Sequence, residues 1–228
     1  MMRKKGSHVG IVLSFVVFVT FLVFLYSTLQ PVLKVDESKK VLLENLKVSL
    51  VQNFSTELTK VIFKNEDGNC ITLAKTDLDI GSEDYGYVAK AGDNLVGISV
   101  NEDITMIGVK ELYYSTALET LQTSVNCEEG LTNTAIGSVS TKEYVFYSLI
   151  NETNSSLGTD GYYETLKKDT LKIIEGDFDF VFTPDDGEVI RYEQKPPESV
   201  NIYTDEILLS YIDDKANIKY GVLFIRVW

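Results

Sequence analysis

Histidine is almost absent from this chain, and cysteine, tryptophan and proline are scarce. The 228 residues include one His, two Cys, one Trp and four Pro. The single histidine, His8, lies close to the N-terminus. Ser-His-Asp triads, Cys-His pairs and histidine-ligated metals are therefore excluded from the rest of the chain. We expect no catalytic residues, no metal site and no cofactor.

Basic residues are also in the minority. The chain has 21 Lys and Arg against 34 Asp and Glu, a net charge of -13. Nucleic acid is not an expected partner, because phosphate binding needs clustered Lys and Arg. Glycine-rich phosphate loops, dinucleotide fingerprints and nucleophile elbows are absent as well. The proportions of hydrophobic and charged residues, 44% and 24%, are typical of a folded protein rather than a disordered one.

One long apolar run dominates the N-terminal region. It extends from Val9 to Leu29 without a charged residue. A helix of that length spans about 30 Å, the thickness of the hydrocarbon core of a bilayer. Arg3, Lys4 and Lys5 precede the run, and the first acidic residue is Asp36. Because basic residues resist translocation, the sequence predicts a single-pass protein of the cell membrane, with a cytoplasmic N-terminus and an extracytoplasmic C-terminal domain.

A cleaved secretory signal is the alternative interpretation of the same run. Such signals have an apolar region of about 7–15 residues and end in a small-x-small cleavage site. Here the run is longer, and the segment from Tyr26 to Pro31 offers no such site. We therefore expect a signal-anchor, with residues 1–33 forming a cytoplasmic leader and a transmembrane helix.

Three small residues in this region are spaced by four. Gly6, Gly10 and Ser14 form a small-xxx-small pattern, which lets two helices approach closely in lipid. Gly and Ser are also common in membrane helices that make no such contact. The pattern predicts a helix contact face toward a copy of this chain or another surface protein.

The residues before the apolar run resemble a known leader. Met-Met-Arg-Lys-Lys-Gly is similar to the leader of archaeal type IV pilin precursors, and Lys4 to Val9 resembles the start of a group of uncharacterised archaeal single-pass membrane proteins. In the pilin family a dedicated peptidase cuts after the basic-Gly pair and leaves the hydrophobic helix attached. The resemblance implies a cut between Gly6 and Ser7. Filament-forming pilins usually carry Glu at the fifth position after the cut, where this chain has Ile11.

A second helical pattern follows the apolar run. Pro31 removes one helical N–H, so we expect a kink or a break there. Beyond it, apolar residues recur at steps of three and four and define one face of an amphipathic helix: Leu42, Leu43, Leu46, Leu50 and Phe54. We expect a stalk helix over residues 34–55 that packs on a β-rich domain or on the stalk of a neighbour.

Residues 56–228 read as a β-rich extracytoplasmic domain. Short β-favouring runs are separated by turns rich in Gly, Asn and Asp, which predicts four hairpin units: 59–64 with 71–73, 85–89 with 95–100, 178–182 with 189–192, and 207–212 with 218–228. The last run has apolar residues on both faces, so we expect that strand to be covered on both sides. We expect one helix over 160–176, a second over 110–124, and a loop over 126–140.

The predicted fold class is therefore α+β. A transmembrane helix continues into an amphipathic stalk helix, and a mainly antiparallel β-sheet or sandwich with one or two short helices follows. No Pro-rich or Ser-rich linker divides the exported part.

The two cysteines predict a disulfide. Cys70 and Cys127 both lie beyond the membrane run, in a compartment where disulfides persist. Closing that loop stabilises a domain by about 4 kcal/mol in the chain-entropy model. Two separate buried thiols are the alternative, since free cysteine is often buried.

Two Asn-x-Ser/Thr sequons, at Asn151 and Asn154, lie close together in a segment that reads as a polar loop. Such sequons are glycosylation acceptors where the host has the machinery. Four aspartates, Asp177, Asp179, Asp185 and Asp186, fall on the outer face and turn of a predicted hairpin, where we expect them to be solvated. Carboxylate pairs can hydrolyse glycosides, so an exported carboxylate-dependent enzyme is the least favoured interpretation.

The sequence thus predicts a membrane-anchored, surface-exposed structural or interaction protein of pilin-like architecture, without catalysis. The alternative is an isolated membrane-tethered adhesion or ligand-binding module that does not polymerise.

Overall fold

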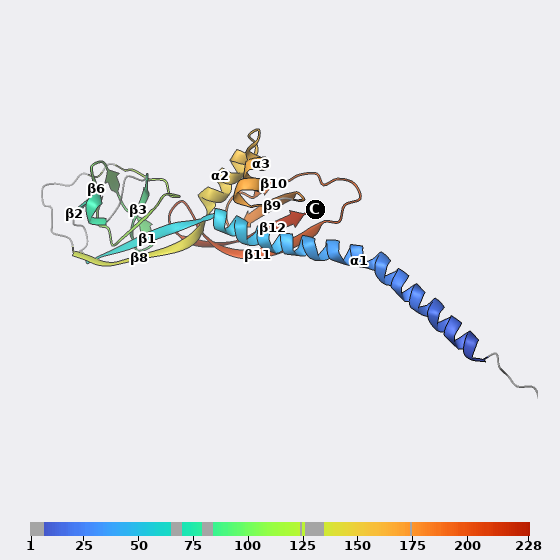
Figure 1. Cartoon of the computed structure of the whole chain (residues 1–228). Coiled ribbons are helices and arrows are strands. Elements are labelled where there is room, and N and C mark those ends of the chain that lie inside the picture. The colour runs from blue at the N-terminus through green and yellow to red at the C-terminus, as the bar shows by residue number, and fades with distance from the viewer. Residues whose placement is uncertain (1–6, 65–69, 79–83, 124, 126–134, 174) are drawn as a thin grey trace, which may run out of the picture.

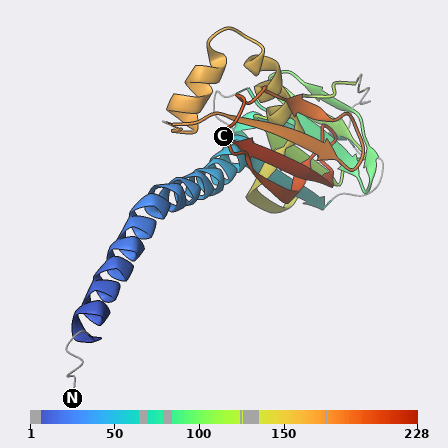
Figure 2. The same cartoon turned by 90° about the vertical axis from the view of Figure 1, so that its right-hand side faces the viewer.

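A long helix leads into a β-rich head. The computed structural model describes residues 7–64, 70–78, 84–123, 125, 135–173 and 175–228. Helix α1 (Ser7–Asn53) has 47 residues and extends from the N-terminal end into the head, which consists of strands and short helices (Figures 1 and 2). The order of the elements confirms the predicted α+β fold.

Helix α1 does not break at Pro31. Its helical backbone is continuous, and its axis bends between the free part and the part that lies on the head (Figure 2). Proline removes one backbone donor and distorts the helix, which long helices tolerate as a kink. Of the two outcomes expected at this position, the kink agrees with the structure and the break does not.

The head is built on a nine-stranded sheet in the order β10-β9-β12-β11-β8-β1-β7-β3-β4. Every neighbouring pair is antiparallel except β11 and β8, which are parallel. The strands are β1 (Ser55–Lys64), β3 (Gly86–Ala91), β4 (Asn94–Leu95), β7 (Glu111–Ser115), β8 (Ala135–Phe146), β9 (Phe178–Pro184), β10 (Ile190–Tyr192), β11 (Tyr203–Ile212) and β12 (Ile218–Val227).

A smaller sheet and four short helices complete the head. The small sheet has the order β2-β6-β5, with β2 at Cys70–Ala74, β5 at Ile98–Val100 and β6 at Asp103–Ile107. The helices are the 3₁₀-helix η1 (Lys75–Leu78), α2 (Tyr147–Leu157), α3 (Tyr162–Thr165) and the π-helical turn η2 (Leu166–Thr170). The small sheet lies at the end of the head far from α1, and α2 and α3 lie beside β9 and β10 (Figure 1).

The second half of α1 packs on the large sheet. Its apolar residues Leu43, Leu46 and Leu50, together with Phe54 just after its end, are buried against β9, β11 and β12. The Phe54 ring lies 5.6 Å from the ring of Phe180, centroid to centroid. Burying such side chains stabilises a fold by about 1.5–3 kcal/mol each. The predicted amphipathic face is therefore the face that binds the helix to the head.

A second core lies between the other half of the large sheet and the small sheet. Val61 and Leu112 of the large sheet are fully buried there, as are Ile71, Ile104 and Met106 of the small one. At this end of the head the small sheet packs on the large sheet, and at the other end α1 packs on the large sheet.

The two C-terminal hairpins confirm the sequence prediction. β11 and β12 pair along their whole length, from Tyr203 opposite Val227 to Ile212 opposite Ile218, and β9 pairs with β10. The hairpin predicted between 85–89 and 95–100 is correct only at its turn. β3 pairs with the two-residue β4, but residues 98–100 form β5 in the small sheet.

Four other predictions were wrong. The hairpin expected between 59–64 and 71–73 does not form, because β1 lies in the large sheet and β2 in the small one. Residues 111–115 form strand β7 and not part of a helix, because Leu112 and Tyr114 alternate into the core between β1 and β3. Residues 135–140 belong to β8 rather than to a loop, while 126–134 lie outside the described residues. The helix expected over 160–176 is limited to α3 and η2. Helix α2 was not expected at all.

Strand β12 lies inside the sheet, as predicted, but only one of its faces is covered. Leu223, Ile225 and Val227 are buried, whereas Tyr220 and Val222 on the other face are 53% and 36% exposed. Gly221 shares the buried face, because a Cβ there would meet the ring of Phe182 at 2.6 Å. The expectation of cover on both sides was wrong for the first half of the strand, where Tyr220 and Val222 face solvent, while Phe224 is half-buried.

Replacing Leu46 with alanine tests the packing of α1 on the head. Leu46 is completely buried, and Leu→Ala at such sites costs about 2–5 kcal/mol. Val48→Ala is the matched control, because Val48 lies on the same helix and is 55% exposed. Denaturant unfolding of the detergent-solubilised chain should show a large loss for Leu46→Ala and almost none for Val48→Ala. Equal losses would contradict the packing described.

Candidate functional site

The first candidate feature is the free part of α1. From Gly10 to Thr28 the helix is exposed along its whole length, with a mean hydropathy of 2.5. Within the part of the chain that the structure describes, it is the one helix long and apolar enough to cross a membrane. An unpacked apolar helix next to the N-terminus is compatible with a signal or an anchor.

Gly10 and Ser14 of α1 are not covered by any of the described residues. A Cβ added at Gly10 would meet nothing within 4 Å, and Ser14 is exposed one turn further on. Gly6 lies outside the described residues, and the helix begins at Ser7. The predicted contact face and the predicted cut after Gly6 both stay predictions.

The second candidate feature is a cavity in the head, which we call the lysine–tyrosine cavity. It has a volume of about 540 Å³ and lies on the face of the large sheet opposite the small sheet, next to the β11–β12 turn. Strands β1, β3, β7 and β8 and that turn contribute its lining. The charged and aromatic side chains in it are Lys60, Lys90, Lys142, Asp93, Glu111, Tyr113 and Tyr144.

Strand register explains why these side chains meet. Lys60 of β1 lies opposite Tyr113 of β7 on one side and Ser140 of β8 on the other. Glu111 lies opposite Lys90 of β3. Side chains two residues apart along a strand share a face, and cross-strand neighbours lie about 4.5–5.5 Å apart. Four adjacent strands therefore present one continuous polar floor.

Lys60, Glu111 and Tyr113 form a charge network. Lys60 Nζ lies 2.7 Å from Glu111 Oε1, and the Tyr113 hydroxyl donates to Glu111 Oε2 at 2.7 Å. Burial opposes the charged form of Glu111, but hydrogen bonds from Lys60 and Tyr113 outweigh it and lower the pKa of Glu111. Burial, and then the neighbouring Glu111 carboxylate, raise the pKa of Tyr113. The positive charge of Lys60 is thus compensated within the cavity.

Lys90 fastens the β11–β12 turn to the sheet. It is 5% exposed, and its Nζ donates to the Ala216 carbonyl at 2.9 Å and to Asn217 Oδ1 at 2.8 Å. Its ammonium also lies 5.0 Å from the centroid of the Tyr113 ring. Burial lowers the pKa of Lys90. Because two of its three donors hold the turn, Lys90 acts as a structural cation at the edge of the cavity.

Lys142 is different, because its side chain has no ion-pair or hydrogen-bond partner among the described residues. It is exposed and lies opposite Leu58 in the sheet. Three lysines therefore line the cavity against two carboxylates, Glu111 and Asp93. In a chain with a net charge of -13 this is a local concentration of lysines, whose charge Asp213 near Lys90 offsets further. The sequence did not predict this cavity, because its residues come together only through the pairing of four strands.

The two predicted glycosylation sites lie on a helix and not on a loop. Asn151 and Asn154 belong to α2. Thr153, which completes the first sequon, is 5% exposed and accepts a hydrogen bond from Asn53 Nδ2 at 3.3 Å. Both asparagines are placed by the structure, and their modification stays a prediction.

The predicted disulfide also stays a prediction. Cys70 is the first residue of β2, and Cys127 lies outside the described residues.

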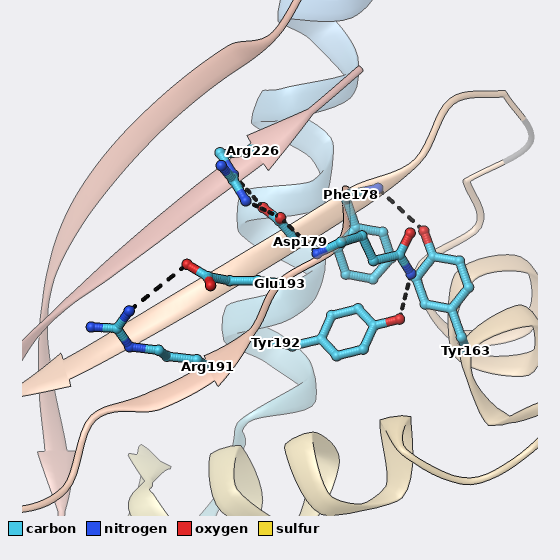
Figure 3. A network of polar contacts seen from close by, with 8 residues as sticks. Tyr163, Phe178, Asp179, Arg191, Tyr192, Glu193 and Arg226 are labelled. Atoms are coloured by element: carbon cyan, nitrogen blue, oxygen red, sulfur yellow. Dashed lines mark hydrogen bonds and ion pairs between the residues drawn. The ribbon is translucent and has the colours of Figure 1, made fainter. Parts of the chain in front are cut away.

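One of the four aspartates is not solvated as expected. Asp179 is 1% exposed and pairs with Arg226, whose Nε lies 2.7 Å from Asp179 Oδ1 (Figure 3). The backbone N–H of Gln194 donates to its other oxygen at 3.1 Å. Asp177 and Asp186 pair with Lys167 and Lys219. Because Asp179 is buried in a paired network, it stabilises the sheet.

Tyr163 closes the same end of the head. Its ring stacks on Phe178 and Tyr192, and its hydroxyl accepts a hydrogen bond from the backbone N–H of Phe178 at 3.2 Å (Figure 3). Burial raises the pKa of Tyr163 strongly.

No three His, Cys, Asp or Glu side chains of the described ranges lie close enough together to hold a metal ion.

Replacing Lys90 with methionine tests the fastening of the turn. The variant keeps the length of the side chain but leaves the Ala216 carbonyl without its donor, which costs about 1–3 kcal/mol. Lys142→Met is the control in the same cavity and should change stability by less than about 0.5 kcal/mol. Urea unfolding of both variants is the measurement. Equal stabilities would contradict the structural role of Lys90.

The Lys60–Glu111 pair predicts a dependence on pH. The pKa of Glu111 is lowered from 4.5, so its ionised form stabilises the fold above that pH, and this contribution is lost as the pH falls through the lowered value. The difference in unfolding free energy between the native chain and Glu111→Gln should therefore shrink below pH 4.5. A constant difference for Glu111→Gln would contradict the pair.

Comparison with known proteins gives no relative for this arrangement. No protein-family model, no curated protein and no solved structure matches the chain.

Proposed function

We propose that this protein is a membrane-anchored, extracytoplasmic structural or interaction protein without catalysis. The observation that carries the proposal is α1, whose apolar part is exposed and whose amphipathic part is buried on the head. An exposed apolar helix of this length is stable in lipid and costly in water. One continuous helix would then join the bilayer to the folded head.

The charges near the ends of the span support the orientation. Arg3, Lys4 and Lys5 precede the helix, and the rest of the chain carries the acidic excess. Basic residues are retained in the cytoplasm, so the head would lie outside. There it would be soluble and would be repelled from anionic lipid headgroups by its negative charge.

The resemblance to pilin precursors supports a structural role within this proposal. A hydrophobic helix that continues into an amphipathic one on a β-rich head is the arrangement expected of such a protein, and Gly6 and Ser7 supply the processing site. Gly10 and Ser14 offer an uncovered surface for a neighbouring helix. Ile11 stands where filament-forming pilins usually carry Glu, which argues against assembly into a pilin-type filament.

The lysine–tyrosine cavity favours a second candidate function, a tethered ligand-binding module that does not polymerise. Its volume lies within the range of about 300–1,000 Å³ that is typical of small-molecule sites. A monomer in detergent extracts would favour this second function, and a large oligomer or filament the first.

Charged substitutions in the span test the anchor. Val17→Arg together with Phe18→Arg places two charges near the middle of the span, each at a cost of about 2.5–3.5 kcal/mol. The variant should leave the carbonate-resistant membrane fraction, where the native chain should remain. Val48→Arg is the control, since Val48 is exposed on the head-bound part of α1. A native chain released by carbonate would contradict the anchor.

A further inference from the structure

We propose that the lysine–tyrosine cavity binds a saccharide that carries a single carboxylate, such as a uronic acid residue of a polysaccharide. This inference rests on the second candidate function and is independent of the membrane anchor. It follows from the charge, the surface chemistry and the rigidity of the cavity.

The charge balance favours a monoanion. Lys60 is paired with Glu111, and Lys90 is buried and donates two of its three N–H groups to the β11–β12 turn. Lys142 is exposed, so it is the most accessible of the three ammonium groups to a ligand. One carboxylate can pair with it, and such charge-assisted hydrogen bonds are among the stronger ones. A phosphate dianion would bring a second negative charge toward Glu111 and Asp93, which like-charge repulsion disfavours.

The remaining lining suits a polyhydroxylated ring. The rings of Tyr113 and Tyr144 present apolar surface beside polar groups, a combination that fits a ligand with both kinds of face. Ser140 can donate or accept a hydrogen bond, and the Asp93 carboxylate can accept one from a sugar hydroxyl. A simple carboxylic acid would use Lys142 but would leave these groups without partners.

The site is held rigidly. Lys142 and Tyr144 lie on β8, which pairs with β1 along ten residue pairs. Tyr113 is held between β1 and β3, and Lys90 fixes the turn at the side of the cavity. Sites on strands keep their geometry better than sites on mobile loops, so little ordering is needed when a ligand binds.

The test is a titration of the full chain in a polyoxyethylene detergent, which carries no sugar headgroup. Isothermal calorimetry with glucuronate or galacturonate should show saturable binding. Glucose, which lacks the charge, and acetate, which lacks the ring, should each bind at least about tenfold more weakly. Glucose 6-phosphate should also bind more weakly than the uronates, because its phosphate carries the second charge.

Matched variants assign the binding to this cavity. Lys142→Met should weaken uronate binding about tenfold or more and leave the unfolding midpoint unchanged. Lys215→Met is the control, because Lys215 is exposed on the β11–β12 turn and does not line the cavity. Tyr144→Leu should weaken the uronate more than acetate, since only the sugar contacts the ring.

Several results would overturn the proposal. These are the absence of saturable uronate binding, equal binding by glucose or acetate, tighter binding of glucose 6-phosphate, and equal losses in Lys142→Met and Lys215→Met. The anchor would survive each of them, because the membrane fractionation of these variants does not depend on the cavity. Failure of the ligand and failure of the anchor are therefore distinguishable.

Discussion

The fold depends on the burial of one face of α1 against the large sheet. Leu46, Leu50 and Phe54 lie fully inside the head and contact apolar side chains of β9, β11 and β12. Hydrophobic burial is the main favourable term in folding, and here it also fixes the direction in which the exposed part of the helix leaves the head. The same helix is therefore apolar and exposed over Gly10–Thr28 and buried along one face where it lies on the head, and the residue pattern changes between these two parts.

Local patterns in the sequence predicted the elements whose signals are local. The long uncharged run predicted the first part of α1, and a period near 3.6 in the apolar residues predicted its amphipathic part. The Asp-rich turn predicted the β11–β12 hairpin. The errors occurred where tertiary packing outweighs propensity. Residues 111–115 have a pattern that a helix could share, but β1 and β3 pair with them on both sides.

The lysine–tyrosine cavity shows a different limit of sequence reasoning. Lys60, Lys90 and Lys142 are distant in sequence, and no motif in the sequence connects them. Cross-strand register brings them together, and register is set by pairing partners that no single segment encodes. Asp179 is a similar case, because alternation assigned it correctly to the outer face but could not show that Arg226 and Gln194 cover it.

The last strand of the chain has a consequence for how the protein can be made. β12 occupies the middle of its half of the sheet, between β9 and β11, and lines the floor on which α1 rests. The backbone of Trp228, next to the end of β12, exchanges two hydrogen bonds with Asp177 at 3.0 Å each. During synthesis the apolar stripe of α1 emerges well before β9, β11 and β12, the strands that cover it. The nascent chain must therefore keep that stripe shielded until these strands have been made.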